Sequence, residues 1–296
     1  MQGRFSLPVL RALLENGIDV CAVVLPASPG SSRHLPAIYQ RQQPRSTHSL
    51  LPVLNSALHS NILQLAWKRQ IPVWEVTRLA DTTTNSTLAD YQPDCICVAC
   101  FSLRIPKNVL AIPSLGCLNV HPSLLPANRG PEPLFWTFRQ GLKQTGVSIH
   151  CMDEGMDTGD LLAQEVIEVP DGISYAHLEQ HCATRGGELL AQTVYALYEG
   201  RAKRKPQDEA KASYWPFPRA EDYIVPAAEW EARHIYNFIC GVADWGEPVR
   251  LSIGDEYIVV QKALSYSLIN ASIPQQRGYC WQDTELWVRC KNGWVA

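Results

Sequence analysis

The sequence has no apolar run long enough to cross a membrane and no secretory leader. Spanning a bilayer takes roughly 20 consecutive apolar residues, and no stretch of the chain approaches that length. The N-terminus also lacks a basic start followed by an apolar run and a cleavage site. We therefore expect a cytoplasmic protein.

The sequence also lacks a large excess of positive or of negative charge. The 26 Lys and Arg residues are nearly balanced by 29 Asp and Glu residues, which leaves a formal net charge of -3. This balance excludes a wholly basic nucleic-acid binder, so any RNA contact must be confined to one region. A length of 296 residues provides ample material for a core and predicts two domains.

The ten cysteines lack the spacing of a metal site. Cys95, Cys97 and Cys100 form the densest group. On a strand the first two side chains would share one face and the third would point the other way, which makes a poor chelate. We expect buried free thiols and no metal.

Apolar strands alternate with helices through the first 200 residues. Ser6 is expected to cap a first helix that stops at Gly17. Further helices are predicted at residues 62–69, 133–139 and 175–198, and strands at residues 18–25, 73–76, 95–99, 115–120, 146–152 and 161–169. This alternation indicates an α/β fold with a mostly parallel sheet that is covered on both faces.

The composition changes after residue 200. Residues 201–221 are rich in Lys, Arg, Pro and Ala without an apolar period, which is typical of a linker. Beyond it, a helix at residues 227–240 precedes short alternating runs at 249–253 and 257–261. We predict a first domain over residues 1–200, a linker over 201–221 and a small β-barrel-like domain over 222–296.

Polar side chains follow the apolar strand at residues 115–120. Because strand side chains alternate, Asn119 and His121 project to the same side, and Pro122 holds His121 extended. Strand ends of this kind line the ligand crevice of parallel sheets. An amide beside an imidazole suits acyl transfer, which needs an oxyanion stabilised and a proton managed. The alternative is a turn-capping asparagine and a structural histidine.

A second polar loop follows the strand at residues 146–152. It places Asp153, Asp157 and Asp160 among glycines, which alone would indicate a turn or a solvated corner. A carboxylate beside His121 would raise the pKa of the imidazole and fix its orientation. We therefore predict that Asn119, His121 and Asp157 act together.

These spaced motifs, with Arg129-Gly130 between them, resemble the folate-dependent formyltransferase family, and most closely its branch that acts on methionyl-tRNA. The matching stretch runs from about residue 5 to residue 190. The resemblance implies a Rossmann-like catalytic domain, a smaller barrel domain, and 10-formyltetrahydrofolate as the formyl donor.

The resemblance also assigns roles residue by residue. The family's catalytic residues fall on Asn119, His121 and Asp157. Its folate contacts fall on Ser102, Leu103, Ile105, Ser123, Leu124, Leu125, Pro126, Asp153, Glu154, Gly155 and Met156. In the implied mechanism the acceptor amine attacks the formyl carbon. Asn119 and His121 stabilise the oxyanion, while Asp157 orients His121 and helps to relay the proton.

The family begins with an apolar strand that ends in glycine, and this sequence starts essentially at that glycine, Gly3. The first strand is therefore expected to be missing. A central strand is hard to omit from a packed sheet, so we expect an upstream start or a fragment.

The acceptor amine is predicted less directly. Arg33, Arg41 and Arg45 lie where the tRNA enzymes insert a basic loop, and they suit phosphate contacts. This favours initiator methionyl-tRNA, although the same arginines could lie in a solvated loop. Pro122 after His121 is common in the enzymes that act on glycinamide ribonucleotide and sugars, so an amino-sugar nucleotide is the runner-up.

Other classes of protein remain as alternatives. A binding protein could keep the fold and lose the catalysis, binding folate or RNA without turnover. The triplet Asp157-Thr158-Gly159 also occurs in aspartic proteases, but the sequence has no second copy of it. His177 and His181 lie four residues apart, but the glutamate expected directly after the first histidine of a zinc hydrolase is absent.

Overall fold

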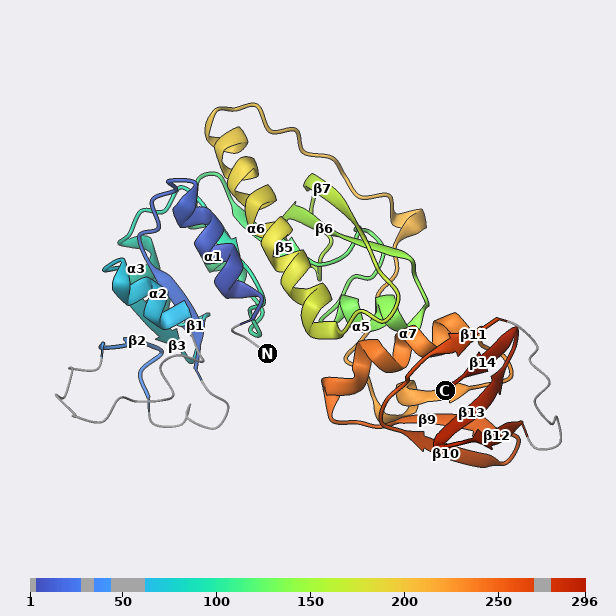
Figure 1. Ribbon diagram of the computed structural model, residues 1–296. Helices are drawn as coiled ribbons and strands as arrows, with labels where there is room; N and C mark the ends of the chain where they lie inside the picture. The colour runs from blue at the N-terminus through green and yellow to red at the C-terminus, as the bar shows by residue number, and fades with distance from the viewer. Residues whose placement is uncertain (1–3, 28–34, 44–61, 269–277) are drawn as a thin grey trace.

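The computed structural model describes residues 4–27, 35–43, 62–268 and 278–296 (Figure 1). Strands and helices alternate through most of the chain, and a smaller part built mainly of strands follows at the C-terminal end. The α/β class and the small C-terminal β domain predicted from the sequence are confirmed.

The first sheet has three strands in the order β1-β3-β2. Strand β1 (Val23–Pro26) is parallel to β3 (Val73–Val76), and β2 (Ile38–Gln40) is antiparallel to β3 on its other side. The helices of this part of the chain are α1 (Ser6–Glu15), α2 (Ile62–Lys68) and α3 (Thr82–Ala89).

The second sheet has four strands in the order β4-β5-β6-β7. Strand β4 (Ile96–Val98) is parallel to β5 (Cys117–His121), whereas β6 (Gln144–Cys151) and β7 (Leu161–Glu168) each run antiparallel to the strand before them in this order. The accompanying helices are α4 (Lys107–Leu110), α5 (Pro133–Arg139) and the long α6 (Tyr175–Tyr198). The strand pairing is thus more mixed than the mostly parallel sheet predicted from the alternation, because β2, β6 and β7 each pair antiparallel with a neighbour.

In the described residues, the C-terminal part consists of two short sheets, one α-helix and three short 3₁₀ helices. One sheet has the order β10-β9-β8 and the other the order β11-β14-β13-β12. The elements are η1 (Glu209–Lys211), η2 (Ala220–Tyr223), β8 (Ile224–Pro226), α7 (Ala232–Val242), η3 (Ala243–Trp245), β9 (Val249–Ile253), β10 (Glu256–Val260), β11 (Tyr266–Ser267), β12 (Tyr279–Gln282), β13 (Glu285–Cys290) and β14 (Gly293–Val295).

One hydrophobic core joins α5 and α6 to the C-terminal part. The ring of Phe135 on α5 packs against the rings of Tyr223, Phe238 and Trp245, at centroid distances of 5.3, 5.8 and 5.2 Å. The guanidinium of Arg139 lies 4.4 Å from the centre of the Trp230 ring. Helix α5 is therefore held against α7 by aromatic packing.

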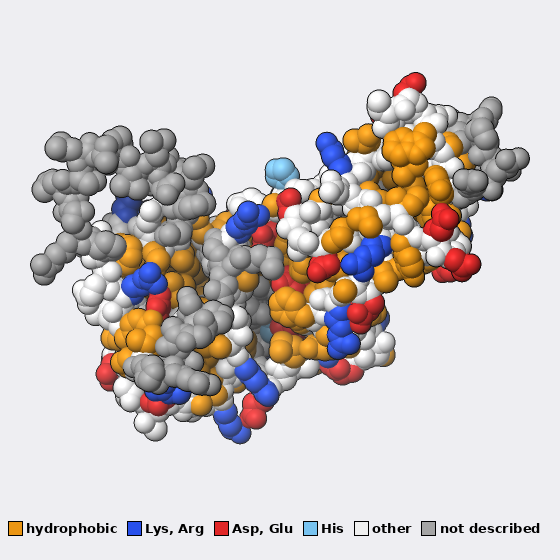
Figure 2. All heavy atoms as spheres, turned by 90° about the horizontal axis from the view of Figure 1, so that it is seen from below, with side chains coloured by type: hydrophobic (Ala, Val, Ile, Leu, Met, Phe, Trp, Pro, Cys, Tyr) orange, Lys and Arg blue, Asp and Glu red, His pale blue; other side chains and the backbone are white. Residues whose placement is uncertain are grey.

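The surface of the C-terminal part carries several exposed apolar side chains. Figure 2 shows hydrophobic side chains gathered on this part, at the upper right of the view. The exposed large apolar residues here are Tyr257, Val259, Leu264, Leu268 and Trp281. Within the described residues, no helix is both long enough and apolar enough to span a membrane.

Candidate active site

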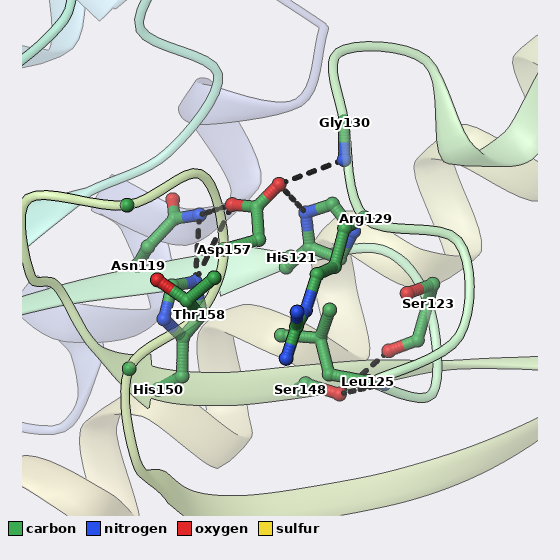
Figure 3. A network of polar contacts seen from close by, with 12 residues as sticks. Asn119, His121, Ser123, Leu125, Arg129, Gly130, Ser148, His150, Asp157 and Thr158 are labelled. Carbon is green, nitrogen blue, oxygen red and sulfur yellow. Dashed lines mark hydrogen bonds and ion pairs between the residues drawn. The ribbon is translucent and has the colours of Figure 1, made fainter. Parts of the chain in front are cut away.

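The predicted catalytic residues come together where β5 ends (Figure 3). Asn119 and His121 lie two residues apart on β5, and Asp157 comes from the loop between β6 and β7. The side chains of Asn119 and His121 both point toward the Asp157 carboxylate. His150 of β6 is directly opposite Asn119 in the antiparallel register and joins the same group.

His121 is buried, and each of its ring nitrogens has a distinct neighbour. Its Nε2 lies 2.9 Å from the carbonyl oxygen of Asn128, to which it must donate its hydrogen. Its Nδ1 lies 3.7 Å from Oδ2 of Asp157, which is longer than a hydrogen bond but close enough for an ion pair when the ring is protonated. Nδ1 is therefore the ring atom that remains to accept a proton.

Asp157 is fixed by its backbone as well as by its side chain. Its φ of 56° lies in the left-handed region, which is uncommon for residues other than glycine. Its Oδ2 accepts a hydrogen bond of 2.9 Å from the Gly130 amide. A side chain at residue 130 would strike the carbonyl oxygen of Trp215 at 2.1 Å, and its φ is 117°, so only glycine fits.

The pKa values of His121 and Asp157 are both lowered, for different physical reasons. Burial lowers the pKa of His121, and the Asp157 carboxylate only partly offsets this. Burial acts to raise the pKa of Asp157, but His121, His150 and the Gly130 amide outweigh it and hold the pKa at about 2. At neutral pH the site thus contains a neutral imidazole beside a carboxylate.

His150 was not predicted from the sequence, and it orients Asn119. Its Nδ1 lies 2.9 Å from the carbonyl oxygen of Cys151, so this nitrogen carries the hydrogen. Its Nε2 then accepts from Nδ2 of Asn119 at 3.2 Å. The other N–H of Asn119 faces Oδ1 of Asp157 at 3.5 Å, a long contact, so this N–H can turn toward a ligand oxygen.

A second unpredicted residue, Gln207, holds the Asp157 loop from the segment predicted as a linker. Its Nε2 donates to the carbonyl oxygens of Asp157 and Gly159, at 2.8 and 2.7 Å. Its Oε1 accepts from the buried Arg129 at 2.9 Å, and Arg129 also pairs with Glu209 at 2.6 Å. Sequence patterns give no signal for Gln207, because its partners lie about 50 to 80 residues away along the chain.

We expect Gln207→Ala to lower kcat about 10- to 100-fold, because a small misplacement of a catalytic group is costly. Loss of two hydrogen bonds would let the Asp157 loop shift relative to His121. Steady-state kinetics of the formyl transfer that the resemblance implies would measure the change. Lys211→Ala, on the exposed surface of the same segment, is the control and should leave kcat unchanged. Equal rates in both variants would contradict the role of Gln207.

The two predicted walls of the folate site face each other. Nη2 of Arg104 donates to the carbonyl oxygen of Glu154 at 2.5 Å, and Nζ of Lys107 lies 3.0 Å from Oε1 of Glu154. These contacts place the segment of Ser102, Leu103 and Ile105 beside the segment of Asp153, Glu154, Gly155 and Met156. Ile105 is buried in a core cluster with which Leu103 packs, while Ser102 and Met156 are exposed.

The predicted folate loop of Ser123, Leu124, Leu125 and Pro126 is held by the neighbouring strand β6. Buried Ser148 donates to the carbonyl oxygen of Ser123 at 2.6 Å and accepts from the Leu125 amide at 3.1 Å (Figure 3). Ser123 and Leu125 are themselves buried, whereas Leu124 and Pro126 are half-buried. Ligand contact by Ser123 or Leu125 therefore stays a prediction.

The predicted acceptor-binding arginines are only partly visible. Arg33 and Arg45 lie outside the described residues. Arg41 follows β2 and forms an ion pair with Glu75 of β3, which also accepts a hydrogen bond from Tyr39. Its role toward an acceptor stays a prediction.

The described residues contain no cluster of three or more His, Cys, Asp or Glu side chains placed to hold a metal ion. The ten cysteines are all free thiols. His177 and His181 are exposed on α6, while Glu179 between them is buried on the opposite face.

Comparisons with known proteins identify the family of this chain. A family model described as formyl transferase matches residues 9–194. A methionyl-tRNA formyltransferase of Syntrophus aciditrophicus is 34% identical over 99% of this chain and 86% of its own length. Another from Pelotomaculum thermopropionicum is 33% identical over 81% of this chain and 70% of its own length.

The fold is also that of a solved N-formyltransferase from Helicobacter canadensis, which was crystallised with folinic acid and dTDP-3-aminofucose. The TM-score is 0.66 at 15% identity, over 99% of this chain and 95% of that one. Likeness at this identity concerns the fold alone.

Proposed function

Because the chain belongs to the formyl transferase family, we propose that it moves a formyl group from 10-formyltetrahydrofolate to a primary amine, the amino group of methionyl-tRNA. The observation that carries this proposal is the convergence of Asn119, His121 and His150 on the Asp157 carboxylate. Such a group supplies an oxyanion donor, a base and a charge that stabilises the protonated base.

The geometry assigns a role to each atom. The amine nitrogen attacks the formyl carbon, and the N–H of Asn119 that faces Asp157 turns to the developing oxyanion. The amine proton passes to Nδ1 of His121, because Nε2 is engaged by the Asn128 carbonyl. Asp157 stabilises the resulting imidazolium. The bond from carbon to the folate nitrogen then breaks, and that nitrogen takes up a proton.

The folate site is proposed to lie between the facing walls described above. The contacts of Glu154 with Arg104 and Lys107 hold the walls together, and both walls adjoin the strands that carry the catalytic group. Exposed Met156 and half-buried Leu103 provide apolar surface for a flat ring.

Methionyl-tRNA is favoured as acceptor by the names of the relatives in Syntrophus and Pelotomaculum. The charge of the segment at residues 201–221 also supports it, with six Lys or Arg residues against three Asp or Glu residues. Residues 222–296, by contrast, have six basic and nine acidic residues, so the C-terminal part has no basic excess. An amino-sugar nucleotide is the second candidate, because Pro122 follows His121.

The proposal is tested by measuring tetrahydrofolate release from 10-formyltetrahydrofolate by the purified protein. The reaction is run with methionyl-tRNA, with an amino-sugar nucleotide, or with neither. Release that requires methionyl-tRNA is the expected result, and dependence on the sugar nucleotide would correct the acceptor. Folded protein that binds folate without any release would replace the proposal with a binding function.

The His121 ring should titrate with a pKa below the ordinary value of about 6.5, because burial lowers it. His121 must be neutral to accept a proton, so the imidazole should remain able to act as the base below about pH 6.5. Asp157 remains charged throughout, since its pKa is about 2. NMR titration of the His121 ring checks this separately from the acceptor amine, whose own ordinary pKa is about 7.7 to 8.0. A ring that titrates above about 6.5 would contradict the assignment.

A further inference from the structure

Ser213, in the segment predicted as a linker, binds the loop of residues 126–129 through three of its polar groups. Its amide donates to the Pro126 carbonyl at 3.1 Å, and its own carbonyl oxygen accepts from the Arg129 amide at 2.9 Å. Its side-chain Oγ accepts from the Asn128 amide at 2.8 Å. The two peptide units on either side of Asn128 are therefore both hydrogen-bonded to one serine.

These contacts fix the direction of the Asn128 carbonyl. A peptide unit is planar and trans, so its N–H and its C=O point to opposite sides. The Arg129 N–H belongs to the same peptide unit as the Asn128 carbonyl and donates to Ser213, while this carbonyl lies 2.9 Å from Nε2 of His121. Asn128 is buried and has a φ of 58°, in the left-handed region. Loss of the bond to its amide would free Asn128 to leave that region and turn its carbonyl away from His121.

The direction of that carbonyl decides which nitrogen of His121 carries the hydrogen. In a neutral imidazole one nitrogen donates and the other accepts, and the tautomer is set by the hydrogen bond that each nitrogen can make. The Asp157 carboxylate lies 3.7 Å from Nδ1 and favours a hydrogen on that atom. The Asn128 carbonyl favours the hydrogen on Nε2 instead. The proposed mechanism needs this second tautomer, because a bare Nδ1 has to accept the amine proton.

We propose that Ser213 is a positioning residue, which acts through Asn128 to hold His121 in the tautomer with the hydrogen on Nε2. This role rests on the proposed function, because His121 is the base of that reaction. Without the Ser213 hydroxyl, the amide of a buried residue would lose its acceptor, which is costly enough to make the loop rearrange. The segment predicted as a linker would then position the catalytic group twice, through Gln207 and through Ser213.

The tautomer is read by NMR of protein whose histidine side chains carry ¹⁵N. In a neutral ring, the nitrogen that carries the hydrogen and the bare nitrogen have well separated chemical shifts. Spectra are recorded at about pH 8, above the ordinary histidine pKa of about 6.5. The His121 signals are assigned among the eight histidines with His121→Ala. The wild-type ring should carry its hydrogen on Nε2.

In Ser213→Ala the tautomer with the hydrogen on Nδ1 should appear, and kcat for formyl transfer should fall about tenfold or more, because the base is then partly blocked. Ser213→Thr retains the hydroxyl and should restore both the wild-type tautomer and most of kcat. Ser114→Ala removes an exposed hydroxyl elsewhere and should change neither. If Ser213→Ala does not fold, Ser213→Cys replaces it, because a thiol is only a weak acceptor.

Three results would overturn the proposal. A wild-type ring with its hydrogen on Nδ1 would show that Asp157, and not Asn128, sets the tautomer. A Ser213→Ala ring with the wild-type tautomer would exclude the link through Asn128, whatever happens to kcat. A Ser213→Thr protein as impaired as Ser213→Ala would show that the hydroxyl is not the group that acts. The NMR readout needs no turnover, so a failure of this proposal and a failure of the proposed function are distinguishable.

Discussion

His121→Ala should lower kcat for formyl transfer by about 10²- to 10⁴-fold, with a small effect on KM for the folate. His121 is the neutral base of the proposed mechanism, and its Nδ1 lies 3.7 Å from Asp157 while Nε2 is anchored on Asn128. Alanine removes the proton acceptor and leaves Asn119 in place to bind the oxyanion. Single-turnover and steady-state rates of the variant would measure the loss.

A matched control for His121→Ala is available on α6. His181→Ala changes an exposed histidine far from the catalytic group in sequence and should leave kcat unchanged. Far-UV circular dichroism and Tm of both variants separate loss of chemistry from loss of fold, because His121 is buried and its removal also creates a small cavity. A folded His121→Ala protein within about tenfold of wild-type kcat would exclude His121 as the base.

Asp157→Asn should cause a loss of similar size, about 10²- to 10⁴-fold in kcat, because it removes the charge that stabilises the imidazolium. Asparagine retains the size of the side chain and can still accept the bond from Gly130 through its one oxygen. The variant should also lower the pKa of His121, since the carboxylate raises it in the wild-type protein. NMR titration of the His121 ring would report that shift directly.

The same substitution should change the pH dependence of stability. The pKa of Asp157 is about 2 in the folded protein and about 3.9 in an unfolded chain. Its ionised form therefore stabilises the fold above pH 4, and this contribution is lost as pH falls toward 2. The difference in unfolding free energy between the wild-type protein and Asp157→Asn should shrink over that range in urea denaturation.

Local apolar spacing was sufficient to predict the bounds of several helices and strands. The bounds of α5, α6, β3 and β9 agree with the ranges predicted from apolar spacing, because each element buries one face or both at its own period. The placement of Asn119 and His121 on one strand end followed from the alternation of strand side chains.

Other boundaries depended on distant residues. Helix α7 was predicted from residue 227 but begins at Ala232, where the Ala232 amide donates to the side chain of Asn292, 60 residues away. The prediction that Ser6 caps α1 was wrong. Phe5 occupies the cap position and makes no side-chain cap hydrogen bond, and Ser6 is the first helical residue. The residue at which a helix begins therefore depends on tertiary contacts that apolar spacing does not reveal.

The sequence by itself determined the α/β class, the family resemblance and the candidate trio of Asn119, His121 and Asp157, because the class depends on local apolar periodicity and the trio on motifs that the resemblance matches in order. The tertiary structure decided that His150 lies opposite Asn119 and that Gln207 holds the Asp157 loop. Both contacts join segments about 30 to 50 residues apart, so they depend on strand register and chain path. Local periodicity has no information about either, since a side chain's partners across a sheet are fixed only when the whole core packs.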